Sequence, residues 1–92
     1  MKTIWKVILE IVDTQKIEVP QGSKVLSVGM QHGKLAMWFL TDPESTVCMS
    51  PVRIYGTGHS DDDDPGTYYG SVQLNGGNLV FHVFGDLERA SE

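Results

Sequence analysis

The chain has 92 residues, of which 40% are hydrophobic and 21% charged, and a formal net charge of −5. This composition predicts one globular domain over residues 1–92 and excludes a disordered chain. The seven Lys and Arg residues are spread along the chain, so it lacks the clustered basic face of a duplex-DNA-binding protein. A single cysteine, Cys48, excludes an internal disulfide and a cysteine zinc cage.

The N-terminal residues alternate between apolar and charged types, which is not the pattern of a secretory signal. The longest apolar run, Leu35 to Leu40, is too short to span a bilayer. We therefore expect no membrane partner and a location in the reducing cytoplasm.

Apolar and polar residues alternate with period two along most of the chain, which predicts strands rather than helices. The expected strands are residues 3–11, 15–20, 23–30, 35–41, 46–56, 68–74 and 79–84. The dipeptide His32-Gly33 and the segment "NGGN" are typical of hairpin turns. The expected fold is all-β, a small antiparallel sandwich or open barrel of about seven short strands.

Two local interruptions are also expected. Proline has no N–H to donate to a sheet, so Pro51 predicts a break or bulge in the fifth strand. The polar tail "DLERASE" predicts a frayed end.

Two of these strands, "LAMWFL" and "LVFHVF", are apolar on both faces. In a two-layer all-β domain only one face of each sheet meets the core, so the other faces would form an exposed apolar patch. We therefore expect self-association as a homodimer or homotetramer, with Trp38, His82 and Phe84 at the interface. The alternative is that the sheet curls over these side chains or that a C-terminal segment covers them.

The segment "RIYGTGHSDDDDPGTYYG" contains the strongest candidate for a ligand site. Val52 and Ile54 should point into the core, which places Arg53, Tyr55 and Thr57 together on the opposite face.

Arginine suits phosphate and tyrosine suits a stacked base. Gly56 and Gly58 allow close backbone approach, and the backbone N–H groups of such a turn can form an anion-binding nest. With His59 as a further hydrogen-bonding group, the expected ligand-binding residues are Arg53, Tyr55, Thr57, Gly58 and His59. The alternative is structural: the glycines form a bulge and turn, and Arg53 pairs with an aspartate of the acidic loop. We use this name for the segment that contains Asp61 to Asp64 and Pro65.

The run Asp61 to Asp64 lacks the spacing of an EF-hand, because Pro65 and Gly66 interrupt it and the twelfth-position glutamate is absent. A solvated loop without a bound metal is expected, and no cofactor is implied. Catalysis is poorly supported, since His59 and the aspartates are consecutive in one loop and would be poorly preorganised. The expected class is therefore not an enzyme.

The segments "IWK", "KVLSV", "WFLTDPES", "RIYGTGH", "DDDPG", "YYGSVQ" and "VFHVF" resemble a family of small uncharacterised bacteriophage and prophage proteins over nearly the whole chain. A proline commonly follows the histidine in similar sequences, whereas Ser60 stands there in this chain.

The resemblance implies action inside an infected bacterial cell. It also implies an anti-defence role, as an oligomeric sponge that sequesters a cyclic-nucleotide immune signal. The alternative is a protein-binding inhibitor of a host defence complex, such as a CRISPR effector, or a phage structural protein.

Overall fold

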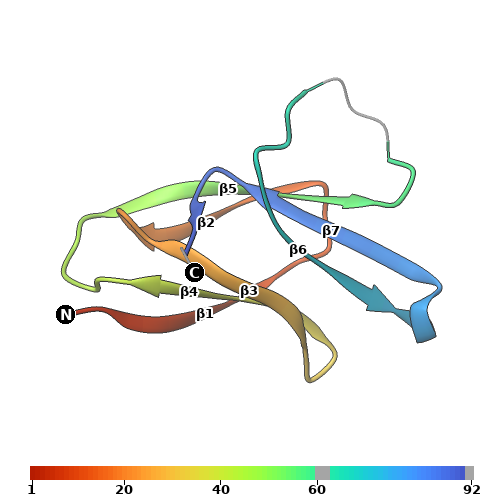
Figure 1. The fold of residues 1–92 in the computed structure, drawn as a ribbon, viewed down its shortest axis with the longest axis horizontal. Coiled ribbons are helices and arrows are strands. Elements are labelled where there is room, and N and C mark those ends of the chain that lie inside the picture. Colours follow the sequence, from red (N-terminus) through yellow and green to blue (C-terminus); the bar gives the residue numbers. More distant parts are fainter. Residues whose placement is uncertain (60–62, 91–92) are drawn as a thin grey trace.

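The structure, a computed structural model, describes residues 1–59 and 63–90. Its strands form two sheets packed face to face, which confirms the predicted all-β sandwich (Figure 1). Sheet A contains, in spatial order, β1 (Thr3–Leu9), β4 (Lys34–Thr41), β3 (Lys24–Gln31) and β8 (Glu88–Arg89). Sheet B contains β2 (Thr14–Pro20), β5 (Val47–Gly56), β7 (Leu79–Gly85) and β6 (Thr67–Leu74). Within residues 1–59 and 63–90, no helix is long and apolar enough to cross a membrane.

All strand pairs are antiparallel except β3 with β8. The predicted His32-Gly33 turn joins β3 to β4, and both residues have positive φ, 52° and 76°. Two consecutive positive φ values define the type I′ turn that matches the twist of a hairpin. The "NGGN" segment joins β6 to β7 through a single 3-10 turn (Asn75–Gly77), so both predicted hairpins are confirmed.

The core lies between the sheets and is built by the alternation that the sequence displays. Every second residue is buried from Leu35 to Thr41 in β4 and from Ser50 to Ile54 in β5. The remaining core residues are Leu9, Ile17, Val19, Val25, Tyr69, Val72 and Val83. The prediction that Val52 and Ile54 point inward is confirmed, and Arg53 and Tyr55 therefore lie on the outer face of sheet B.

The expected interruption at Pro51 is wrong. β5 runs without a break from Val47 to Gly56, and Pro51 pairs with Lys16 of β2. The Ile54 N–H donates to Asp13 on the β2 side, so by alternation the Pro51 nitrogen faces the β7 side. Pairing with β7 stops at Val52, and the missing donor of Pro51 therefore costs no ladder hydrogen bond.

The polar tail is not simply frayed. Glu88 and Arg89 add a short parallel strand beside β3. The preceding residue, Leu87, packs against the core, and the Tyr69 hydroxyl accepts from its N–H (2.7 Å) and donates to its carbonyl (3.1 Å). These two hydrogen bonds satisfy the backbone of Leu87 and hold the tail in place.

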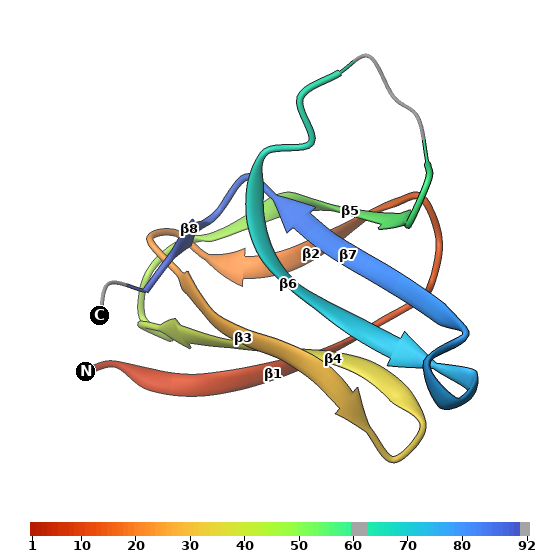
Figure 2. The same ribbon diagram turned by 45° about the vertical axis from the view of Figure 1, so that its right-hand side comes forward.

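The main contact between the two sheets is that of β3 with β6, which run side by side in Figure 2. A β-bulge at Tyr69 interrupts the β6–β7 register, and Gly70 follows it with a φ of 150°. A Cβ at Gly70 would lie 2.6 Å from a methyl group of Val28, so only glycine fits this crossing. We call this side of the sandwich, formed by β3, β6 and β8, the closed side.

Candidate functional site

Three of the residues expected to bind a ligand share the outer face of sheet B. Arg53 lies beside Phe84, and Tyr55 lies beside His82, in the register of β5 with β7. Thr57 follows on the same side, where its hydroxyl contacts the His82 ring. The sequence-based placement of Arg53, Tyr55 and Thr57 on one face is therefore correct.

The segment after β5 turns back over this face. The His59 N–H donates to the Gly56 carbonyl at 3.0 Å, and Gly58, with a φ of 91°, occupies the third position of the turn. This is the position of a type II turn that requires positive φ. The turn brings the His59 ring flat against Tyr55, with ring centroids 4.4 Å apart and planes 6° from parallel.

The stack is the first part of a longer row of rings. Phe84 lies 5.6 Å from Tyr55 and 5.4 Å from Tyr68, both centroid to centroid and both tilted. We call His59, Tyr55, Phe84 and Tyr68 the aromatic row. It crosses β5, β7 and β6 and gives the outer face of sheet B a continuous π surface.

A chain of hydrogen bonds runs beside the aromatic row. The Tyr68 hydroxyl contacts Ser71 Oγ at 2.6 Å, and Ser71 Oγ contacts His82 Nδ1 at 2.7 Å. His82 Nε2 contacts Thr57 Oγ1 at 2.8 Å. A neutral imidazole donates from one nitrogen and accepts at the other, so both ring nitrogens of His82 are satisfied by hydroxyl groups.

Arg53 is already engaged. Its Nη1 donates to the Pro65 carbonyl and to Asp86 Oδ1, both at 2.9 Å. The hydrogen bond to Asp86 raises the pKa of Arg53 above its usual value. The structural alternative expected from the sequence was that Arg53 pairs with an aspartate of the acidic loop. Arg53 does pair with an aspartate, but this residue is Asp86, which follows β7. The acidic loop contributes the Pro65 carbonyl, and Asp61 and Asp62 lie outside the described residues.

The expected anion-binding nest needs several free backbone N–H groups in the turn, and two of them are already used. The Thr57 N–H donates to the Val80 carbonyl at 3.2 Å, and the His59 N–H is used within the turn. Both donors are therefore unavailable to a ligand. A guanidinium has five N–H donors, and within the described part of the chain both hydrogen bonds of Arg53 leave from Nη1, so an anion would meet Nε and Nη2.

The three residues expected at an oligomer interface do not form one surface. His82 and Phe84 belong to the outer face of sheet B, as described above. Trp38 lies on the outer face of sheet A, over Gly29 and between Lys6 and Ser27 in the register of β4. No single contact patch on one sheet can therefore include all three.

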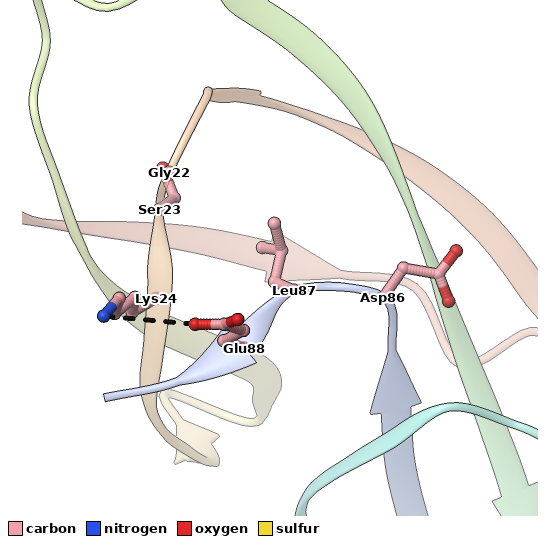
Figure 3. A pocket seen from close by; sticks show the side chains of 6 residues that line it. All are labelled: Gly22, Ser23, Lys24, Asp86, Leu87 and Glu88. Atoms are coloured by element: carbon pink, nitrogen blue, oxygen red, sulfur yellow. Dashed lines mark ion pairs between the residues drawn. The ribbon is translucent and has the colours of Figure 1, made fainter. Parts of the chain in front are cut away.

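A hollow of about 290 Å³ lies at the end of the closed side, where the β2–β3 turn meets β8. Figure 3 shows Lys24 and Glu88 facing each other there as an ion pair (4.0 Å), with Asp86 pointing away from them. Asp86 is the partner of Arg53, so the charged groups of this hollow are paired with each other or with sheet B. In the described ranges, no group of three or more His, Cys, Asp or Glu side chains is placed to hold a metal ion.

The sequence did not single out Tyr68, Ser71 or Asp86 as parts of the site. Tyr68 and Ser71 are three residues apart, and strict alternation places such residues on opposite faces. The bulge at Tyr69 returns them to the same face. Gly70, a glycine inside a strand pattern, was the signal that could have indicated this bulge.

The fold and this face define a small two-sheet β-sandwich with an aromatic outer surface. A family model described as a domain of unknown function, DUF7352, matches residues 1–92. The chain belongs to this DUF7352 family. No curated protein matches the chain, and no solved structure matches it either.

Proposed function

We propose that this chain is a non-catalytic binding protein that holds a small nucleotide-type anion on the outer face of sheet B. The observation that carries the proposal is the parallel stack of His59 on Tyr55 at 4.4 Å. A planar ring already occupies the position where a base would stack on Tyr55. A ligand base can extend this stack on the far side of the His59 ring, or replace His59 when the turn opens.

The surrounding groups suit the other parts of such a ligand. Arg53 lies on the same face, and its hydrogen bonds to described residues leave from Nη1, so Nε and Nη2 would meet a phosphate. Thr57 offers a hydroxyl group. Gly58 has no Cβ, and no described residue lies within 4 Å of where one would stand, so a ligand can approach its backbone closely. These are the roles of Arg53, Tyr55, Thr57, Gly58 and His59 in the proposal.

The electrostatics of the face determine how such a ligand is held. Asp86 lies 2.9 Å from Arg53 and offsets its charge, and the chain as a whole is acidic. Stacking, worth about 1–3 kcal/mol per base, therefore contributes more than phosphate contacts. Binding should consequently depend only weakly on salt, because few cations are involved.

The resemblance to bacteriophage proteins suggests the biological setting of this proposal. A phage protein of this kind acts in the cytoplasm of the infected host, and a cyclic nucleotide that signals infection is the ligand class to test first. Sequestering such a signal needs binding without chemistry, which fits a site built of rings and hydroxyl groups.

A panel of cyclic di- and trinucleotides, tested by thermal shift and calorimetry, would test the proposal, since a ligand of the native state raises the melting temperature. Tyr55→Ala should weaken binding by about 1–3 kcal/mol. Arg53→Ala should weaken it too, and should also cost about 1 kcal/mol of stability through the lost hydrogen bonds. Lys16→Ala, which removes a positive charge elsewhere on the same face, is the matched control and should bind normally.

The outcome against the proposal is equally definite. If no cyclic nucleotide shifts the melting curve, or if Tyr55→Ala binds as tightly as the parent, the nucleotide site is wrong.

The second candidate function is a protein-binding inhibitor. It is favoured by the outer face of sheet A, where Ile4 and Ile8 are exposed and Trp38 and Leu40 are half-buried. Trp38→Glu should then abolish activity in infected cells while Tyr55→Ala has no effect. The nucleotide proposal expects the reverse pattern.

A further inference from the structure

The four sheet edges of this sandwich differ in how they are protected against pairing with another strand. Unpaired edges normally carry charges, proline, a bulge or a very short strand. β2 carries Lys16, Glu18 and Pro20, β6 contains the bulge at Tyr69, and β8 has only two residues. β1, the fourth edge, is seven residues long and, within the described ranges, pairs only with β4.

The one charged side chain of β1 does not protect its edge. Lys6 Nζ donates to Gln31 Oε1 of β3 at 2.6 Å. Since β4 lies between β1 and β3, the lysine crosses the outer face of sheet A. The ammonium group is thereby drawn into its own sheet and away from the open edge.

Apolar side chains are exposed on both faces of this strand. Ile4 and Ile8, on the outer face, are 59% and 46% exposed, and Trp5, on the inner face, is 40% exposed. A partner packed flat on the outer face would cover the two isoleucines and leave Trp5 in solvent. A strand added to the edge covers all three, because its side chains lie on both faces.

A hollow of about 570 Å³ lies at the end of β1. It is lined by Ile8, Leu9, Glu10 and Ile11 on one side and by the β3–β4 turn on the other. An added strand that extends past β1 would end near Ile11, which lines this hollow.

We propose that the occupant is a second copy of this chain, with the two β1 strands paired antiparallel about a twofold axis at Lys6. Lys6 is the midpoint of Thr3–Leu9, so this register pairs all seven residues, whereas a shift to either neighbouring symmetric register pairs five. It sets Ile4 opposite Ile8 of the second copy and Trp5 opposite Val7. Sheet A then continues across the axis as one larger sheet.

The sequence around β1 is complementary to itself in this register. Beyond the strand, Lys2 comes opposite Glu10 of the second copy, which gives an opposite-charge pair at each end. Next to it, Met1 comes opposite Ile11, at the hollow. The one unfavourable element is Lys6 opposite its own copy, a like-charge pair that weakens the sheet less here because each ammonium group is bound to Gln31 of its own chain.

That contact provides a signature specific to the register. Lys6→Thr should tighten the dimer by up to about fivefold, because it removes the only like-charge pair.

The experiment is sedimentation equilibrium from low to high micromolar concentration. The parent should form a dimer, and Ile8→Lys should be a monomer with an unchanged circular dichroism spectrum. Leu79→Lys is the matched control, because Leu79 is 44% exposed on sheet B while Ile8 is 46% exposed, and it should remain a dimer. A parent that is monomeric throughout, or a Leu79→Lys variant that dissociates, would overturn the proposal.

Crosslinking tests the register independently of any loss of affinity. In a Cys48→Ser background, Lys6→Cys should oxidise readily to a disulfide-linked dimer, because residue 6 faces itself. Ile4→Cys and Ile8→Cys alone should not, because each faces the other position. Rapid crosslinking of either single variant, with none at residue 6, would show a different register or interface.

Discussion

The two sides of this sandwich are built on opposite principles. On the closed side, Gly70 lets β6 cross against Val28, and Tyr69 holds Leu87 through two hydrogen bonds. The opposite side carries the edge strands β1 and β2, and we call it the open side. There β1 leaves Ile4 and Ile8 exposed. The same period-two pattern forms both sides, so alternation alone does not say where stability lies. The difference shows that tight contacts are concentrated where the sheets meet, and that the other side remains available to a partner.

The packing around Tyr69 of the closed side should be the most sensitive to an added methyl group, here on the neighbouring Gly85 of β7. In Gly85→Ala the new Cβ would lie 2.6 Å from Tyr69 Oη and 2.8 Å from the Pro51 carbonyl oxygen, so the packing must shift. We expect a loss of about 3 kcal/mol in the free energy of unfolding, measured by urea denaturation. Gly56→Ala should be close to neutral, because among the described residues its Cβ would meet only Phe81, at 3.8 Å. Equal effects at the two positions would contradict this description of the closed side.

The closed side should also weaken at high pH. Burial raises the pKa of Tyr69 to about 12, whereas an unfolded tyrosine titrates near 10. The folded state thus keeps its proton where the unfolded state loses it. The stabilisation is fully present below pH 10 and is lost as the pH rises through about 12, a change of roughly 2–3 kcal/mol.

Tyr69→Phe isolates this effect from the other groups that titrate at high pH. The variant should be less stable than the parent at pH 9, because the backbone of Leu87 loses its partner. The difference between the two proteins, followed by urea denaturation, should shrink between pH 10 and 12. A constant difference over that range would mean that Tyr69 does not carry the pH dependence.

The open side should tolerate substitution with the smallest effect. Ile4→Thr keeps a β-branched side chain on an exposed position, so stability should change by no more than about 0.5 kcal/mol. The measurement belongs at a concentration where the protein is monomeric, because dimerisation would add apparent stability. Ile54→Thr, a buried counterpart on β5, should cost several times more. A large loss of stability in Ile4→Thr would mean that Ile4 contributes to stability as a core residue does.

Much of this fold follows from local sequence. The seven longer strands, the His32-Gly33 turn and the inward direction of Val52 and Ile54 all come from alternation and turn chemistry. β8 could not be predicted in this way, because Leu87 is held by Tyr69, eighteen residues earlier in the chain. The continuity of β5 through Pro51 depended equally on where β7 ends, which is a property of the sheet and not of the strand.

The candidate site likewise combines features that the local sequence predicts with features that it does not. The common face of Arg53, Tyr55 and Thr57 follows from period two within one strand. The partners of these residues come from other strands: Asp86 after β7, and Ser71 through a bulge in β6. Cross-strand register decides such contacts, and nothing within residues 53–59 specifies it.

His82 lies between two hydroxyl groups, so the direction of the hydrogen bonds on the outer face of sheet B can reverse. A neutral imidazole carries one N–H, so when Nε2 holds the proton Thr57 accepts it and its own O–H points outward. When Nδ1 holds the proton instead, Ser71 accepts it and Thr57 must donate to His82. The tautomer of one ring thus sets whether Thr57 presents a proton or a lone pair beside the aromatic row, and Tyr68, at the other end of the chain of hydrogen bonds, reverses with it.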